Sequence, residues 1–202
     1  PLQALIAPQA LPDADSPDED TPQRVWQVVP AGRRPEAPAW VIGSLVHQAL
    51  ALWRFPGADF APWVRARALE FGLTDATQLA HAQTESARLL QQFRRSALFQ
   101  EMDQAERRLP EVPYSYLVNG RAQTGYIDML YEQAGSWTLV DFKTDRVESE
   151  ADMQRLLSQT DYTQQLRQYG RAVQQLLGIT PRLKLCLLNY GREVRVIAVD
   201  GD

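Results

Sequence analysis

The sequence contains few of the residues on which several protein classes depend. A single cysteine, Cys186, among 202 residues excludes an internal disulfide and any cluster that needs several cysteine ligands. It also fits a reducing, cytoplasmic setting. No apolar run approaches the roughly 18 residues that a membrane span requires, and no signal peptide is visible. We therefore expect a soluble protein with no membrane partner.

Lysine is almost absent, since 19 of the 21 basic residues are arginine and only Lys143 and Lys184 are lysine. The net charge of −4 does not favour a nucleic-acid binder. The charge is uneven, however: residues 1–40 hold six acids and three arginines, and the remaining residues are close to neutral. An active site rich in carboxylates would also mask a basic binding surface in this sum.

The first part of the chain has the composition of a tail. Eight of the 13 prolines fall in residues 1–38, and residues 12–23 read PDADSPDEDTPQ. This composition predicts an extended, poorly packed segment over residues 1–37, followed by a folded domain over residues 38–202. The segment is either a linker to an upstream domain or an ordinary frayed terminus.

The spacing of apolar residues predicts the order of the elements. Helical spacing covers residues 39–53, 61–71 and 75–108, and a further helix is predicted from Asp161 as N-cap to Gly178 as C-cap. Strand-like alternation covers residues 113–118, 124–131, 137–142, 183–190 and 193–199. This order predicts an α/β fold in which helices flank a small mixed sheet.

Turn signals allow the strands to be aligned. If the QAGS segment at 133–136 closes a hairpin with two or four loop residues, Asp128 lies opposite Asp141. If the NG pair at 119–120 is a two-residue turn, Glu111 lies opposite Asp128 on the other side. Opposed Cβ atoms are about 4.5–5.5 Å apart, so the three carboxylates would form one row. A one-residue slip or a bulge would break this alignment.

A row of opposed carboxylates needs either a shared proton or a cation. Oxygen ligands select hard cations such as Mg²⁺, Mn²⁺ or Ca²⁺. Lys143 shares a strand face with Asp141 and can offset the negative charge. The alternative interpretation of Asp141 and Lys143 is a surface ion pair at the end of a strand.

Other candidate residues lie on the predicted helices. His47 is either a metal ligand, with Gly43 one turn earlier leaving space for another group, or a partly exposed histidine on a helix flank. Gln165 and Tyr169 are four residues apart and share a helix face, and Tyr162 is close to that face. Core packing is the alternative role for both tyrosines.

These motifs together resemble the PD-(D/E)XK nuclease superfamily, and more closely its RecB-like branch. The resemblance covers roughly residues 40–199. It is carried by Gly43 to His47 (G-x-x-x-H), Glu111 with Pro113 before a strand, Gly125 to Asp128 (G-x-x-D), Asp141 to Thr144 (D-F-K-T) and Gln165 to Tyr169 (Q-x-x-x-Y). Each motif is short, but five in this order are jointly specific. A related subgroup that holds an iron–sulfur cluster with four cysteines is excluded by the single Cys186.

The resemblance implies a restriction-endonuclease-like core and a role for each matching residue. His47, Asp128, Asp141 and the Phe142 carbonyl would bind Mg²⁺, for which Mn²⁺ could substitute. Lys143 would be the catalytic lysine, and Glu111 would assist the metal site. Gln165, Tyr169 and Tyr162 would position the substrate. Arginines would hold phosphates, with candidates at Arg94, Arg95, Arg107, Arg108, Arg146 and Arg167.

The implied activity is metal-dependent hydrolysis of DNA, as an exonuclease on single strands. RecB-like domains often end helicase–nuclease chains of the AddA type, so an upstream helicase domain or a helicase–nuclease partner is expected, with a role in DNA repair and recombination. The alternative is a DNA-end-binding module of the same fold that does not cut.

Overall fold

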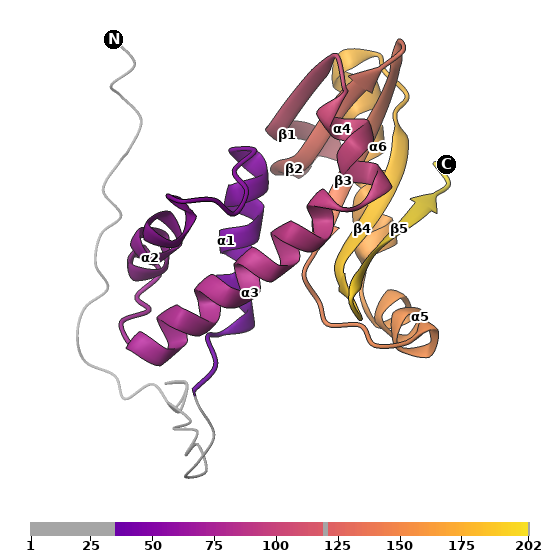
Figure 1. The fold of residues 1–202 in the computed structure, drawn as a ribbon. Coiled ribbons are helices and arrows are strands. Elements are labelled where there is room, and N and C mark those ends of the chain that lie inside the picture. Colours follow the sequence, from indigo (N-terminus) through magenta and orange to yellow (C-terminus); the bar gives the residue numbers. More distant parts are fainter. Residues whose placement is uncertain (1–34, 119–120, 202) are drawn as a thin grey trace, which may run out of the picture. The chain divides into compact units, whose positions relative to one another are not determined.

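The computed structural model describes residues 35–118 and 121–201 (Figure 1). Its helices are α1 (Ala39–Ala51), α2 (Phe60–Glu70), α3 (Ala76–Arg94), α4 (Ala97–Asp103), α5 (Glu150–Gln159) and α6 (Tyr162–Leu177). Its strands are β1 (Arg107–Val118), β2 (Arg121–Gln133), β3 (Ser136–Lys143), β4 (Arg182–Tyr190) and β5 (Glu193–Val199). Within this part of the chain, no helix is both long and apolar enough to span a bilayer. The predicted tail falls largely on residues 1–34, outside the described residues, and remains a prediction.

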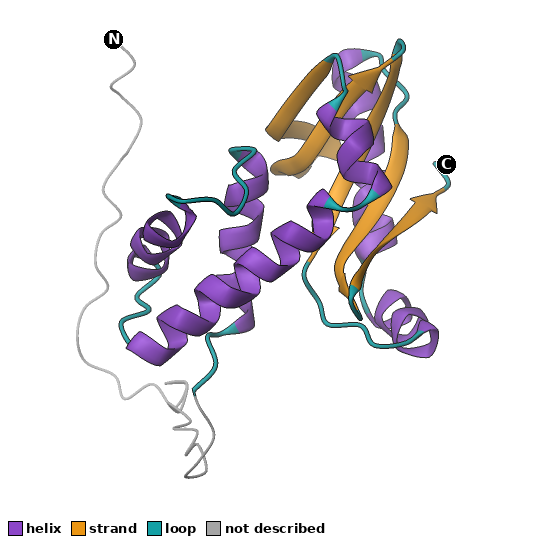
Figure 2. Cartoon of the chain, in the orientation of Figure 1, coloured by secondary structure: helices purple, strands orange, loops and turns teal. Residues whose placement is uncertain are grey.

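The five strands form one mixed sheet in the order β1-β2-β3-β4-β5 (Figure 2). Neighbouring strands are antiparallel except β3 and β4, which are parallel and are connected through α5 and α6. A parallel pair needs such a crossover because the chain must return to the starting edge. The expected α/β fold with a mixed central sheet is confirmed.

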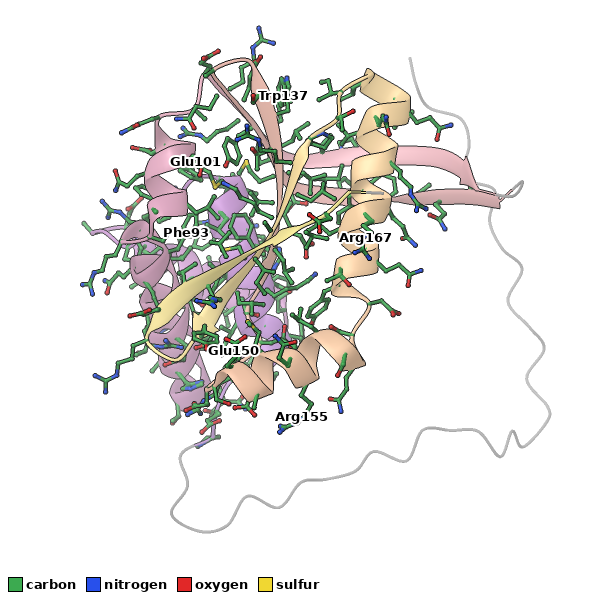
Figure 3. All side chains as sticks on the ribbon, turned by 90° about the vertical axis from the view of Figure 1, so that its right-hand side faces the viewer. Phe93, Glu101, Trp137, Glu150, Arg155 and Arg167 are labelled. Atoms are coloured by element: carbon green, nitrogen blue, oxygen red, sulfur yellow. The ribbon has the colours of Figure 1, made fainter. Side chains whose placement is uncertain are left out.

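Apolar side chains fill both faces of the sheet. One cluster joins the sheet to α1, α2, α3 and α4, and includes Leu45, Phe93 and Phe142. The other joins the opposite face to α5 and α6, and includes Leu139 and Leu166. Figure 3 shows Phe93 and Arg167 on helices at opposite sides of the sheet. Central strand β3 is buried on both faces from Thr138 to Phe142, which explains its nearly continuous apolar sequence.

The hairpin between β2 and β3 has the predicted register. Gln133 faces Ser136 and Met129 faces Val140 across a two-residue turn. Both turn residues, Ala134 (φ 49°) and Gly135 (φ 72°), have positive φ, as hairpin turns with the twist of the strands require. The predicted NG turn at 119–120 lies outside the described residues, but Val118 and Arg121 on either side of it are paired.

The helical prediction over residues 75–108 is confirmed for α3 and α4, but the helix is not continuous and residues 107 and 108 belong to a strand. Ser96 interrupts it, since its side-chain oxygen accepts a hydrogen bond from the Phe99 amide and starts a second helix, α4. The chain from Arg107 onward then belongs to β1 rather than to a helix. Helix α5 was not predicted at all. Helix α6 has the predicted bounds and ends at Gly178 (φ 67°), although the Asp161 side chain makes no capping hydrogen bond.

Candidate active site

The end of β3 carries the most buried charges of the site. Asp141 is 2% exposed, and its Oδ2 lies 2.8 Å from Nζ of Lys143 two residues later. Burial raises the pKa of Asp141 well above the ordinary range of a carboxyl, and the Asp128 carboxylate adds to this effect although Lys143 opposes it. The strand places both side chains on the face toward α6, so the alternative of a surface ion pair does not describe this contact.

Asp128 bridges two elements. Its Oδ2 accepts a hydrogen bond of 2.8 Å from the Phe142 amide of β3, and its Oδ1 lies 3.2 Å from Nδ1 of His47 on α1. Burial alone would lower the pKa of His47, but the hydrogen bond to Asp128 and the charges of Asp128 and Asp141 outweigh it and raise that pKa. The structure therefore links His47 of α1 to Asp128 of β2, and Asp128 to the β3 backbone one residue after Asp141.

The strand alternation expected around Asp128 is not regular. Ile127 and Leu130 pack in the same core cluster although they are three residues apart, and Met129 packs in the other. Asp128 lies one step beyond the last residue pair of β2 with β3, where the two strands separate. This local irregularity lets the Asp128 carboxylate reach both the β3 backbone and α1.

Glu111 lies inside β1, not before a strand as expected. Pro110 faces Met129 and Val112 faces Ile127, so the predicted register holds on both sides of Glu111 and brings it level with Asp128. Its backbone has a left-handed φ of 48°. Although the residue is exposed overall, partial burial of its carboxyl and the Asp128 charge raise the pKa of Glu111. Glu111 and Asp128 line one cleft with His47.

The residues of α6 converge on Lys143. Gln165 accepts a hydrogen bond of 3.1 Å from Lys143 Nζ and donates one of 2.7 Å to the Tyr169 hydroxyl. The ring of Tyr162 lies 4.4 Å from Lys143 Nζ, and its hydroxyl donates to Asp145. An ammonium group this close to an aromatic face is stabilised by a cation–π interaction. Gln165 and Tyr162 therefore hold Lys143 directly, and Tyr169 holds Gln165.

A family model described as PD-(D/E)XK nuclease superfamily matches residues 23–193. The chain belongs to the PD-(D/E)XK nuclease superfamily. It is 28% identical over 168 residues to an ATP-dependent helicase/nuclease protein of Heliobacterium modesticaldum, in an alignment that covers 75% of this chain. The chain spans only 12% of the length of that relative.

The nuclease fold is also found in a crystal structure of a candidate exonuclease from Eubacterium rectale. The TM-score is 0.54 at 16% identity, over 83% of this chain and 61% of that one. At this identity the likeness concerns the fold alone, and it agrees with the mixed sheet and flanking helices. Membership of the superfamily supports phosphodiester cleavage, for which its nucleases generally use divalent metals.

The side chains of the nuclease site fit a divalent cation in their chemistry. In residues 35–118 and 121–201, no three histidine, cysteine or acidic side chains converge on one point, since His47 contacts Asp128 and Asp141 contacts Lys143. The donors nonetheless comprise one imidazole nitrogen and two carboxylates from neighbouring strands. Burial is the main cause of the raised pKa of Asp141, and the neighbouring Asp128 carboxylate adds to it. Hard divalent cations prefer such oxygen-rich sets.

Sequence reasoning missed several residues that support the nuclease site. Tyr114 of β1 covers Gly125, and its ring lies 5.4 Å from that of Tyr169. Asn189 of β4 lies 3.4 Å from the Thr144 carbonyl oxygen, one residue after Lys143. A Cβ atom on Gly43 would lie 3.1 Å from Thr144 Oγ1, which explains a glycine within α1. A register argument could have placed Tyr114 beside Gly125, but nothing in the sequence indicates the Asn189 contact.

Proposed function

We propose that this domain is a metal-dependent deoxyribonuclease that degrades single strands as an exonuclease. The observation that carries the proposal is the position of Lys143, which contacts the buried carboxylate of Asp141 and the amide of Gln165 at once. Burial of charged groups is costly, so a buried pair of this kind is expected where catalysis needs it. The superfamily supports the nuclease activity, and the finer assignment to single-stranded DNA is part of the proposal.

His47, Asp128, Asp141 and the Phe142 carbonyl are the groups that would hold the cation, with Glu111 assisting from β1. Mg²⁺ is the proposed metal, and Mn²⁺ would substitute for it because it accepts the same ligands. Such a cation, when bound, polarises the scissile phosphate and lowers the pKa of the attacking water. The Asp128 hydrogen bond to the Phe142 amide fixes one carboxylate for this task.

Lys143 would stabilise the negative charge that develops on the phosphate and orient the attacking water. Its ammonium group is held between Asp141, Gln165 and the Tyr162 ring, so it needs little reorganisation during the reaction. Gln165 and Tyr169 are positioning residues for Lys143 and for the substrate strand. Glu111 is a further catalytic carboxylate in the same cleft.

The proposed setting is a helicase–nuclease that acts in DNA repair and recombination in the cytoplasm. The relative from Heliobacterium carries helicase and nuclease in its name, and this chain corresponds to 12% of its length. Residues 1–37 would then connect the nuclease domain, residues 38–202, to an upstream helicase domain or lead to a helicase–nuclease partner. DNA is the expected substrate and partner.

The test is cleavage of end-labelled single- and double-stranded DNA with Mg²⁺, with Mn²⁺ and with a chelator. We expect metal-dependent loss of nucleotides from single strands, abolished in Lys143→Ala and retained in Lys184→Ala. Lys184 is a suitable control because it is the other lysine and contacts Glu101 on α4 rather than the site. Binding of DNA ends without cleavage in every metal would instead identify a catalytically silent end-binding module.

A further inference from the structure

A second hollow lies outside the carboxylate cleft, between α3 and the beginning of β5. It has a volume of about 880 Å³ and is lined by Arg88, Arg95, Arg192 and Arg195, together with Gln92 and Glu193. We call this hollow the arginine groove. We propose that the arginine groove binds the phosphate backbone of a nucleic-acid strand that passes through the cleft. The inference rests on the proposed nuclease function.

The charges of the groove are only partly compensated within the protein. Arg88 pairs with Glu85 at 2.9 Å, and Arg195 lies 3.7 Å from Glu150. In the part of the chain that the structure describes, the guanidinium groups of Arg95 and Arg192 have neither a hydrogen bond nor an ion pair. Among the residues that the structure describes, Glu193 is the one acid that lines the groove, so the described lining has an excess of positive charge although the chain has a net charge of −4.

Stabilisation of a helix end does not account for this cluster. Arg95 follows the last residue of α3, where a cation is favourable beside the helix dipole. Arg192 and Arg195 belong to the β4–β5 hairpin on the other wall and have no such role. Cations that face each other across a hollow repel, and a bound polyanion relieves this repulsion. Arginine also forms forked hydrogen bonds that match phosphate oxygens.

The lining suits a single strand rather than a free anion. Val194 and Val196 supply apolar surface beside the arginines, and Val196 is 36% exposed, whereas Leu98 beneath them is buried. Unpaired bases can cover such surface while the backbone phosphates meet the cations. The chemistry therefore favours a nucleic-acid strand over inorganic phosphate.

A chain of hydrogen bonds links the arginine groove to the candidate active site. Arg88 donates a hydrogen bond of 2.7 Å to Asn189, which in turn contacts the Thr144 carbonyl next to Lys143. Asn189 and Thr144 line an intermediate hollow of about 390 Å³ together with Gly43. Gly43 also lines the cleft of about 830 Å³ that holds His47 and Asp128. The intermediate hollow thus shares Gly43 with the cleft and is joined to the arginine groove by the Arg88–Asn189 hydrogen bond. We infer that one strand follows this route.

The test is binding of a fluorescent single-stranded oligonucleotide of about 20 thymidines, measured by anisotropy in chelator over a range of salt concentrations. The double variant Arg95→Gln/Arg192→Gln removes two cations that hold no internal partner. Loss of two phosphate contacts is expected to lower the slope of log K against log salt by about 1.4 and to weaken binding on the order of tenfold near 0.1 M salt. Hydrolysis of a mononucleotide p-nitrophenyl ester, too short to reach the groove, should be unchanged.

The matched control is Arg65→Gln/Arg155→Gln, which removes the same charge from exposed positions outside the groove. It should bind the oligonucleotide with the wild-type slope. An unchanged slope in the groove variant would overturn the proposal, as would equal losses in both variants. A third result would also overturn the proposal. In it, the wild type and the groove variant bind the oligonucleotide equally, but a peptide of residues 12–23 binds the wild type and not the groove variant. Oligonucleotide binding without any cleavage by the wild type would refute the nuclease function and leave the groove supported.

Discussion

Replacing Gly125 with alanine tests whether Tyr114 and Tyr169 hold Lys143, the proposed catalytic lysine, in place. A Cβ atom at position 125 would lie 2.8 Å from the Tyr114 hydroxyl oxygen and 2.9 and 3.0 Å from two of its ring carbons. These distances are shorter than real side chains tolerate, so the Tyr114 ring must move. The ring is not free to do so without consequence, because it lies 5.4 Å from the Tyr169 ring at an angle of 58°.

The expected loss of stability follows from two opposing effects. Overpacking of this kind costs about 1–3 kcal/mol. Alanine restricts the unfolded chain more than glycine does, and this effect alone would raise the free energy of unfolding by about 0.4–1 kcal/mol. We therefore expect Gly125→Ala to lower the free energy of unfolding by about 1–2 kcal/mol, measured by urea denaturation.

The same change should reduce cleavage at saturating substrate and metal. The Tyr169 hydroxyl accepts a hydrogen bond of 2.7 Å from the Gln165 amide, and Gln165 accepts one of 3.1 Å from Lys143. Displacement of the Tyr114 ring is therefore transmitted to the Lys143 ammonium group through three successive contacts, the first of which is with the Tyr169 ring. Small misplacements of a catalytic group cost up to about a hundredfold in rate, and we expect at least about tenfold here.

A second substitution separates this effect from general damage. Tyr114→Leu removes the ring that the new methyl group would strike, so Gly125→Ala/Tyr114→Leu should lose less stability than the sum of the single variants. The reasoning is refuted if Gly125→Ala alone unfolds at the wild-type urea concentration and cleaves at the wild-type rate, or if the two losses simply add.

Three further outcomes are expected. Burial would raise the pKa of Glu101, but hydrogen bonds from Lys184 and Tyr131 outweigh burial and lower that pKa. The ionised Glu101 side chain therefore stabilises the fold at pH values above its unfolded pKa. This contribution is lost as the pH falls through the folded pKa. Glu101→Gln should therefore cost about 1–2 kcal/mol near neutral pH and progressively less below about pH 4, measured by urea denaturation across pH. Tyr162→Phe keeps the ring beside Lys143 and should retain most of the cleavage rate, whereas Tyr162→Leu removes it and should lower the rate; equal rates would contradict a cation–π role. Ala134→Gly should stabilise the protein by about 1 kcal/mol, seen as a higher melting temperature, because alanine is strained at φ 49°.

The part of the site that lies on β2 and β3 was predictable because strand geometry is local and regular. A two-residue turn fixes the register of a hairpin, so the sequence alone predicts the pairs up to Met129 with Val140 and places Asp128 and Asp141 one step beyond them. Gln165 and Tyr169 were predictable as a pair because residues four apart share a helix face. The two carboxylates and the helix pair could thus be identified before any contact between them was known.

Contacts between distant elements were not predictable from spacing. Arg88 and Asn189 are 101 residues apart, and only the parallel pairing of β4 beside β3 brings Asn189 to the Thr144 carbonyl. The irregular backbone at Asp128 was also not predictable from the alternation of side chains along a strand, because this irregularity depends on where β2 separates from β3. The missed boundary at Ser96 has a local cause, because a serine cap within a helical pattern is a weak signal.

The parallel pairing of β3 with β4 has a consequence for how the enzyme is made. Strand β3 can join its hairpin partner β2 as soon as both leave the ribosome, but its other edge stays uncovered until residues 182–190 have followed. Gln165, the hydrogen-bond partner of Lys143, lies in the crossover that this late pairing completes. A nascent chain that stalls before β4 would therefore carry its acidic residues on a sheet that is still open at β3, before the proposed catalytic centre is complete.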